Sequence, residues 1–199
     1  MTLINFVRDQ ELINKIDPEL IFRKAFINYS DDPIYRSKIT RPVYLVENEG
    51  QKYILKMGYK HYDWSKEHIN VEKIILQEIK NMGKFPKLVK DYGEIGDYVA
   101  ILKEFIEGEE LSKRNSPLTN KQLEVQLKET VEYLHKMGYV HIDIRPANII
   151  VGPHESYAKL IDLGFCYLQK DLSPEKFNFW RELDLKCLNG LLAELDRLN

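Results

Sequence analysis

The stretch GYVHIDIRPANIIV, residues 138–151, places four polar side chains among apolar β-formers. They are His141, Asp143, Arg145 and Asn148, with isoleucine or valine between and after them. A buried strand does not usually carry an acid, a base and an amide, because a buried polar group costs free energy unless it has a partner. The stretch therefore predicts a site at which these side chains meet something.

The composition excludes several classes of protein. At 199 residues, one domain or two small lobes sharing an interface is expected. With 44% hydrophobic and 30% charged residues, the chain can bury a core and is not disordered. A net charge of −2 creates no field that would draw it to nucleic acid or to an anionic membrane.

Targeting signals and cysteine usage point to the cytoplasm. No stretch approaches the roughly 18 apolar residues of a membrane span, and the N-terminus lacks a basic region before an apolar core. Cys166 and Cys187 form no CxxC pair and no disulfide framework. We expect a reduced, soluble, cytoplasmic protein.

The periodicity divides the chain into a β-rich half and a helical half. Residues 41–58 alternate on both sides of Asn48-Glu49-Gly50, which predicts a hairpin, and residues 87–105 predict two strands around a Gly-Asp turn. Between them, residues 63–83 have the apolar spacing of a helix, capped by Asp63 or Ser65 and ended by Gly83. We expect an antiparallel sheet with one inserted helix.

The second half begins with a capping box, Thr119 with Gln122, and a helix that runs to a glycine stop at Gly138. A strand within residues 157–165 and a final helix over residues 180–198 follow the opening stretch. The fold class is therefore α+β with two lobes, which suggests a cleft.

Five polar residues are candidates for that cleft. Asp143, Asn148 and Asp162 are two carboxylates and an amide, the ligand types that hard cations such as Mg²⁺ prefer beside phosphates. Lys56 ends an apolar strand and Glu72 lies on a helix face. Considered separately, Lys56 would be a solvated edge residue and Glu72 a residue at the border of an amphipathic helix face. Considered together, they would form an ion pair that holds the Lys56 ammonium toward a polyphosphate.

Together these elements resemble the protein-kinase superfamily. HIDIRPAN is similar to its catalytic loop, IDLG (residues 161–164) to its metal-binding Asp-Phe-Gly motif, and KEFIEGEEL (residues 103–111) to its hinge. Lys56 and Glu72 stand at the positions of the family's lysine–glutamate pair. The five elements occur in the family's order over residues 35–195 or so.

The resemblance implies a role for each residue. Asp143 would accept or orient the proton of the acceptor hydroxyl, and Arg145 would stabilise the transferring phosphoryl group. Asn148 and Asp162 would hold Mg²⁺, and Lys56, fixed by Glu72, would contact the α- and β-phosphates of ATP. Adenine would lie between Val43, Ile54 and Ile150, three apolar residues that fit an ordinary core equally well. The hinge backbone at Glu104 and Ile106 would supply its hydrogen bonds.

The chain also departs from the family pattern. Arg36, Lys38 and Arg41 stand where the family has a glycine-rich loop, so phosphates would be contacted by cationic side chains, unless the loop is simply solvated. No arginine precedes Asp143, which suggests no control through a phosphorylated activation loop. Lys103 stands at the back of the expected adenine pocket, where its charge must find a partner.

Only nineteen residues separate Gly164 from Asp184, and no Ala-Pro-Glu follows. Asp184 is either the family's brace of the catalytic-loop backbone or an ordinary first-turn helix acid. The shortened ending resembles the RIO-type and lipopolysaccharide (Kdo) kinases. We expect a single bilobal kinase-like domain over 1–199, with an N-lobe at about 20–104, a hinge at 105–110 and a truncated helical C-lobe at 111–199.

Three functions remain open: a minimal serine/threonine-type protein kinase, with its own chain among the candidate acceptors, a kinase of a small sugar or aminoglycoside-like molecule, and a pseudokinase acting as a binding module. The first is our prediction, with ATP and Mg²⁺ as cofactors and an unidentified hydroxyl-bearing acceptor as partner. Joint retention of Lys56, Glu72, Asp143, Asn148 and Asp162 argues against a pseudokinase.

Overall fold

The structure is a computed structural model in which residues 3–5, 41, 43–48, 50–79, 83–114, 116 and 118–197 are described. The chain divides into two compact units, which we describe separately. Unit 1 comprises Met1–Gln77 and Lys87–Phe105, and unit 2 comprises Glu78–Pro86 and Ile106–Asn199.

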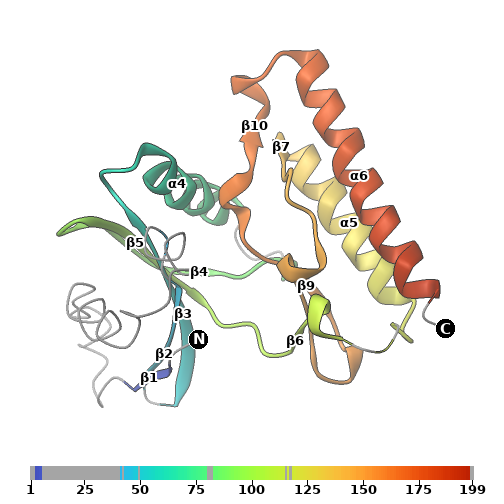
Figure 1. Ribbon diagram of the computed structural model, residues 1–199, viewed down its shortest axis with the longest axis horizontal. Helices are drawn as coiled ribbons and strands as arrows, with labels where there is room; N and C mark the ends of the chain where they lie inside the picture. Colours follow the sequence, from blue (N-terminus) through green and yellow to red (C-terminus); the bar gives the residue numbers. More distant parts are fainter. Residues whose placement is uncertain are drawn as a thin grey trace, which may run out of the picture. The chain divides into compact units, whose positions relative to one another are not determined.

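Unit 1 is built on a five-stranded sheet of order β1-β2-β3-β5-β4 (Figure 1). Its strands are β1 (Leu3–Asn5), β2 (Val43–Asn48), β3 (Gln51–Tyr59), β4 (Leu88–Ile95) and β5 (Tyr98–Glu104). Both predicted hairpins are confirmed, and Gly50 and Gly96 adopt positive φ angles at their turns. The sheet is not purely antiparallel as predicted, because β1, which the sequence did not reveal, pairs with β2 in parallel.

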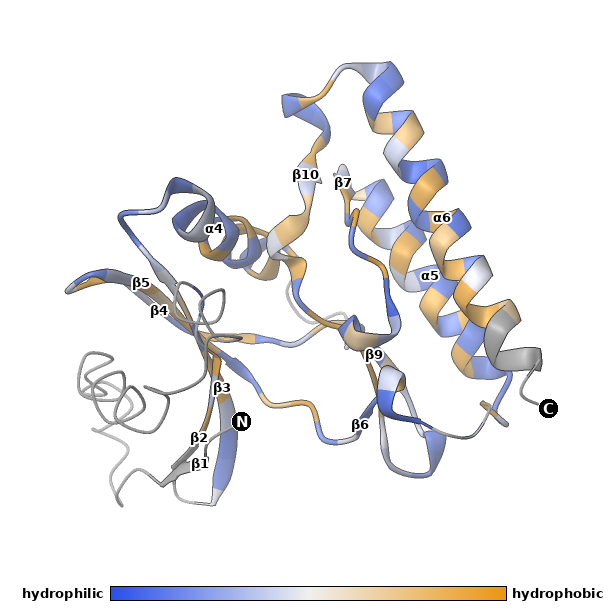
Figure 2. Cartoon of the chain, in the orientation of Figure 1, coloured by the Kyte–Doolittle hydropathy of each residue, from blue (hydrophilic) through white to orange (hydrophobic). Residues whose placement is uncertain are grey.

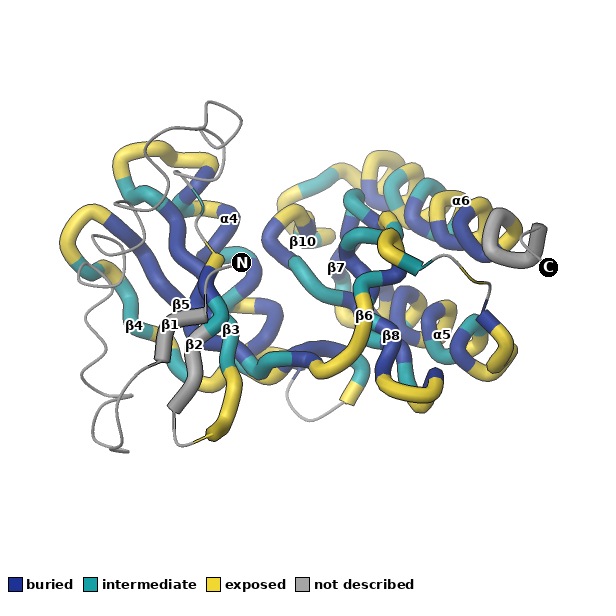
Figure 3. The backbone as a smooth tube through the Cα atoms, turned by 60° about the horizontal axis from the view of Figure 1, so that its bottom comes forward, coloured by how far each residue is buried: buried dark blue, intermediate teal, exposed yellow. Residues whose placement is uncertain are grey.

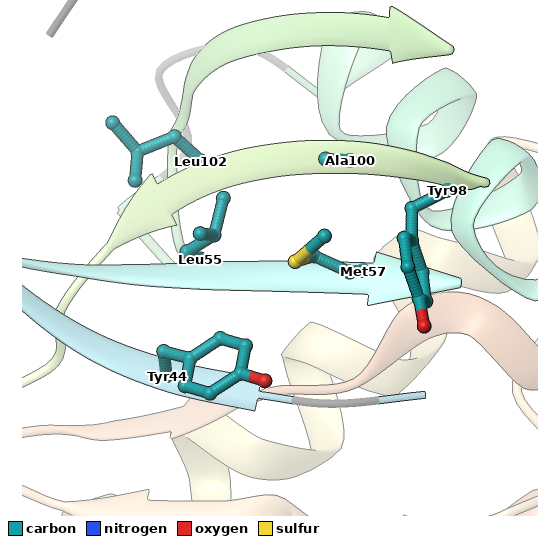
Figure 4. Close-up of a cluster of buried hydrophobic side chains, with 6 residues drawn as sticks. All are labelled: Tyr44, Leu55, Met57, Tyr98, Ala100 and Leu102. Atoms are coloured by element: carbon teal, nitrogen blue, oxygen red, sulfur yellow. The ribbon is translucent and has the colours of Figure 1, made fainter. Parts of the chain in front are cut away.

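The register of the sheet separates its two faces. Tyr44, Leu55 and Leu102 are paired across β2, β3 and β5, and with Met57, Tyr98 and Ala100 they form a buried apolar cluster on one face (Figure 4). Because side chains alternate along a strand, Lys56 and Lys103 point to the opposite face. That face carries a second cluster, Ile69, Val99 and Ile101, to which helix α4 contributes Ile69.

Helix α4 (Asp63–Glu78) packs on this second face. It begins at Asp63, as predicted. The Ser65 hydroxyl accepts a hydrogen bond from the Tyr59 amide (2.9 Å), which links the helix to the end of β3. The helix ends at Glu78, five residues before the predicted stop at Gly83. Glu78 already belongs to unit 2, where its carboxylate accepts a hydrogen bond from the Tyr139 hydroxyl.

Unit 2 contains two long helices, α5 (Gln122–Lys136) and α6 (Pro174–Arg197), which pack on each other. Apolar and polar residues alternate around both (Figure 2), and the buried residues follow the same alternation (Figure 3). Helix α5 ends near the predicted stop, with Gly138 at φ 82°. Helix α6 starts six residues earlier than predicted, because Pro174 is accommodated at its first position.

Short strands complete unit 2. They are β6 (Glu109–Glu110), β7 (Tyr139–Val140), β8 (Ile149–Val151), β9 (Ala158–Leu160) and β10 (Tyr167–Leu168). The predicted hairpin between Asn148 and Asp162 is confirmed as β8 paired with β9, and β6 lies on the other side of β8.

The predicted capping box at Thr119 is wrong. The Thr119 hydroxyl and the Thr119 amide both donate to the buried carboxylate of Glu155 (2.9 Å each), which also accepts from the Asn120 amide (2.7 Å) and from Arg114 (2.6 Å). The Gln122 amide instead donates a hydrogen bond to Asn120 Oδ1 (3.0 Å). A carboxylate with four donors outcompetes a local cap.

Within the described residues, every helix is too short or too polar to cross a membrane.

Candidate kinase site residues in two units

In unit 2, Asn148 fixes the carboxylate of Asp143. Its Nδ2 atom donates to Asp143 Oδ2 at 2.8 Å and to the Asp143 carbonyl at 2.9 Å. Asn148 ends the 3-10 turn Pro146–Asn148, where its own amide donates to the Arg145 carbonyl (2.9 Å). Since both donated bonds come from the amide nitrogen, the Asn148 Oδ1 atom is left as an acceptor.

Arg145 approaches the same carboxylate from solvent. Its Nε atom lies 3.3 Å from Asp143 Oδ2, and its side chain is 56% exposed. An exposed ion pair of this kind contributes little to stability, about 0–1 kcal/mol. Its guanidinium remains accessible to a ligand that reaches Asp143.

The hairpin β8–β9 brings Asp162 next to Asn148. The Ile161 amide donates to the Asn148 carbonyl at 2.8 Å, directly before Asp162. Asp162 itself adopts the left-handed conformation, with φ 61° and ψ 66°. Aspartate tolerates this conformation better than most residues, and such outliers cluster at functional sites.

His141 orders the loop that carries Asp143, as the sequence predicted. The Asp143 amide donates to His141 Nδ1 at 3.2 Å, so the neutral ring carries its proton on Nε2. Burial lowers the pKa of His141, against the opposing charges of Asp184, Asp162 and Asp143. The ring is therefore held neutral.

Asp184 braces the backbone of this loop. Its carboxylate accepts hydrogen bonds from the amides of His141 (2.7 Å) and Ile142 (2.8 Å) and from His135 Nε2 (2.9 Å). It lies in the interior of α6, so the interpretation as a first-turn helix acid is wrong. His135 was not among the predicted site residues. Its one signal in the sequence was a position on the buried face of α5 beside Val131 and Leu134.

In unit 1, the predicted ion pair is confirmed. Lys56 Nζ lies 2.6 Å from Glu72 Oε2, and both residues are buried. Lys103 also finds the partner that its charge required, because its ammonium binds Glu72 Oε1. Glu72 therefore receives one lysine on each oxygen.

Two further residues extend this group. His68, one helical turn before Glu72, has its Nε2 atom 3.0 Å from Lys56 Nζ and its Nδ1 atom 3.2 Å from Arg41 Nη1. The Arg41 guanidinium stacks over the Trp64 ring at 4.9 Å. His68 was not among the predicted site residues, although its i, i+4 spacing to Glu72 was a signal that both share a helix face.

The predicted adenine-contacting residues are distributed over both units. Val43 is paired with Lys56, and Ile54 with Lys103, so all four point to one face of the unit 1 sheet. Glu104 ends β5, and its amide donates to the Lys87 carbonyl (2.9 Å). Ile106 and Ile150 belong to unit 2.

The structure thus brings together two sets of predicted residues. Unit 1 holds Arg41, Val43, Ile54, Lys56, Glu72 and Glu104, and unit 2 holds Ile106, Asp143, Arg145, Asn148, Ile150 and Asp162. Arg36 and Lys38 lie outside the described residues.

The donor chemistry of unit 2 fits a magnesium ion. Asn148 offers an amide oxygen and Asp162 a carboxylate, and the backbone hydrogen bond between Ile161 and Asn148 keeps the two segments adjacent. Mg²⁺ typically takes one or two such protein oxygens and completes its shell with water and phosphate. The set is too small for a metal held by protein alone.

Comparison with known proteins identifies the family. The model of the protein kinase domain matches residues 42–179. Human cGMP-dependent protein kinase 2 is 34% identical over 132 residues, covering 60% of this chain and 16% of the relative. Smooth-muscle myosin light chain kinase of Gallus gallus is 35% identical over 130 residues (60% and 7%), and the cAMP-dependent protein kinase catalytic subunit of Dictyostelium discoideum 30% over 142 residues (65% and 21%).

The chain spans less than a quarter of the length of each of these relatives. The matched region includes every described residue of the two sets except Arg41, which lies one position before it. The chain belongs to the protein kinase domain family.

Proposed function

We propose that this protein is an ATP- and Mg²⁺-dependent phosphotransferase, most simply a minimal serine/threonine-type protein kinase. The observation that carries the proposal is the Asp143 carboxylate, oriented by Asn148 Nδ2 and flanked by Arg145. A carboxylate held in this way is suited to accept or orient a hydroxyl proton.

In unit 2, Asn148 and Asp162 serve as ligands of Mg²⁺. The ion supplies neutralisation of phosphate charge when bound. Asp143 orients the acceptor hydroxyl, and Arg145, exposed beside it, stabilises the charge of the transferring phosphoryl group. Asp184 and His141 keep the loop in place for these contacts.

In unit 1, Lys56 contacts the α- and β-phosphates, and Glu72 positions it. Val43 and Ile54 contact adenine, and the Glu104 backbone offers it a hydrogen bond. In unit 2, Ile150 and the Ile106 backbone are proposed for the same two roles. Arg36, Lys38 and Arg41 contribute side-chain contacts to the phosphates in place of a glycine-rich loop; the placement of Arg41 beside His68 on the Lys56 side supports this. The proposal includes one kinase-like domain with an N-lobe at about 20–104, a hinge at 105–110 and a truncated C-lobe at 111–199. Residues Glu78–Pro86 of that expected N-lobe group with unit 2 in the structure.

A protein hydroxyl is the preferred acceptor, in part the chain's own serine and threonine residues. The support is that each relative named above is a protein kinase. The expected cytoplasmic location agrees with such an acceptor.

The test uses γ-labelled ATP and Mg²⁺. The protein is incubated alone, then with a panel of protein substrates, and then with a panel of sugars and aminoglycosides. Label on serine or threonine of the protein or of a panel protein supports the proposal, and label on small molecules only selects the second class of kinase. No label above that of an Asp143→Asn control, with ATP still bound, identifies a pseudokinase.

A further inference from the structure

The Glu72 carboxylate is shared by lysines from two different strands. Lys56 of β3 binds Oε2 at 2.6 Å, and Lys103 of β5 binds Oε1. Glu72 is 0% exposed, and the two lysines are 4% and 5% exposed. The arrangement is therefore a buried carboxylate between two ammonium groups.

The two lysines are engaged differently. Within the part of the chain that the structure describes, the Lys103 ammonium has Glu72 as its polar contact. Lys56 divides its ammonium between Glu72 and His68 Nε2, at 3.0 Å. Lys103 is thus dedicated to the carboxylate, whereas Lys56 has more than one partner.

Removing the only cation beside a buried carboxylate strongly destabilises the folded protein, because the remaining charge is neither hydrated nor paired. A lysine that is the sole partner of such a carboxylate cannot move toward a phosphate without that penalty. With Lys103 on the other oxygen, Glu72 keeps a cation when Lys56 moves. The position of Glu72, and with it α4, then does not depend on Lys56.

We infer that Lys103 is a positioning residue, which neutralises Glu72 in place of Lys56 and so releases Lys56 to bind the phosphates of the nucleotide. The assignment of phosphates to Lys56 rests on the proposed function. The shared neutralisation of Glu72 does not, and it can be tested without nucleotide.

The first experiment is a thermal-unfolding cycle on the full chain without nucleotide. Its variants are Lys56→Met, Lys103→Met and the double variant, with Lys52→Met on the exposed end of β3 as the control. Each single variant leaves Glu72 one ammonium, so the loss of Tm in the double variant exceeds the sum of the single losses by about 5 °C or more. Adding Glu72→Gln to the double variant restores most of that loss, including when the double variant alone does not fold.

Additive losses of Tm, or no recovery with Glu72→Gln, would overturn the shared neutralisation.

The second experiment compares the affinities of ATP and adenosine by calorimetry. In Lys103→Met, Glu72 draws Lys56 back, so ATP affinity falls about tenfold, the change expected for one weakened charge-assisted contact. Adenosine affinity falls by much less than ATP affinity, because adenosine has no phosphate and reports only the effect of the substitution on the adenine pocket.

Rescue distinguishes positioning from packing. Lys103→Arg keeps a cation for Glu72 and retains ATP affinity within about threefold of the wild type, since that difference is under 1 kcal/mol. Equal losses for ATP and adenosine, or unchanged ATP affinity in Lys103→Met, would overturn the positioning role. A wild-type protein that binds neither ligand would overturn the proposed function, while the unfolding cycle would still decide the neutralisation of Glu72.

Discussion

Asp184 Oδ1 accepts a hydrogen bond from the Ile142 amide at 2.8 Å, joining the interior of α6 to a loop residue 42 positions earlier. Ile142 has φ 55°, a conformation that β-branched residues rarely adopt. The bond therefore holds a strained backbone in the loop that carries Asp143.

Replacing Asp184 by asparagine should destabilise unit 2. Asparagine keeps the volume but turns one acceptor oxygen into a donor that faces amide donors, so the free energy of unfolding should fall by about 2–4 kcal/mol. Urea denaturation measures the change. Asp171→Asn, at an exposed acid of the same unit, is the control and should change stability by less than about 0.5 kcal/mol.

Replacing Ile142 by glycine should lower the free energy of unfolding by less than the same change at another half-buried isoleucine. Glycine adopts φ 55° without the steric penalty, which is on the order of 1–3 kcal/mol and partly offsets the lost side-chain contacts. The matched variant is Ile161→Gly, at a position that is half-buried like Ile142 and lies outside the positive-φ residues. Equal losses of unfolding free energy in the two variants would show that Ile142 carries no strain.

The neutral state of His141 predicts a pH dependence of stability. Its pKa in the folded protein is lowered by burial below the ordinary 6.5, so near pH 6.5 the unfolded chain binds more protons than the folded chain. The contribution of neutral His141 to the free energy of unfolding is therefore fully present above pH 6.5 and is lost as the pH falls toward its pKa in the folded protein. In His141→Asn, whose amide oxygen can replace Nδ1 as acceptor, the slope of unfolding free energy against pH between 5 and 6.5 should be smaller than in the wild type. The same slope in both proteins would contradict the assignment to His141.

Substitutions at Asp143 and Arg145 should distinguish an effect on the rate of phosphoryl transfer from an effect on ATP binding. Asp143→Asn removes the proposed proton acceptor, and such groups contribute roughly 10²–10⁴ in rate, so kcat should fall by at least about a hundredfold. ATP affinity should stay within a factor of about two, because Asp143 is not proposed to bind the nucleotide. Arg145→Lys keeps the charge and should retain more activity than Arg145→Ala; equal rates in the two would remove Arg145 from phosphoryl stabilisation.

The sequence predicted the parts of the site whose partners are set by residue type and spacing. Asp143 and Asn148 are five residues apart in one loop, and the Lys56–Glu72 pair followed from a strand and a helix face. The partner of Lys103 could not be predicted in the same way, since it depends on the register that pairs Ile54 with Lys103.

Contacts between distant segments account for the errors. His135 and Asp184 are 49 residues apart, and no local pattern links them. Thr119 matched a capping box in sequence, but Glu155, 36 residues away, takes its hydroxyl. Strand β1 has three residues and joins the sheet at its edge, too short for a period to be visible.

The most direct test of the account is the initial rate of phosphate transfer from γ-labelled ATP, with Mg²⁺, by the wild type and by Asp162→Asn. The substitution removes one ligand charge and keeps the side-chain volume, so circular dichroism should be unchanged. We predict measurable transfer by the wild type and a rate at least about a hundredfold lower in the variant, since charge neutralisation supplies most of the catalysis in phosphoryl transfer. Equal rates in the two proteins would contradict the assignment of Asp162 as a metal ligand and, with it, the mechanism proposed for this chain.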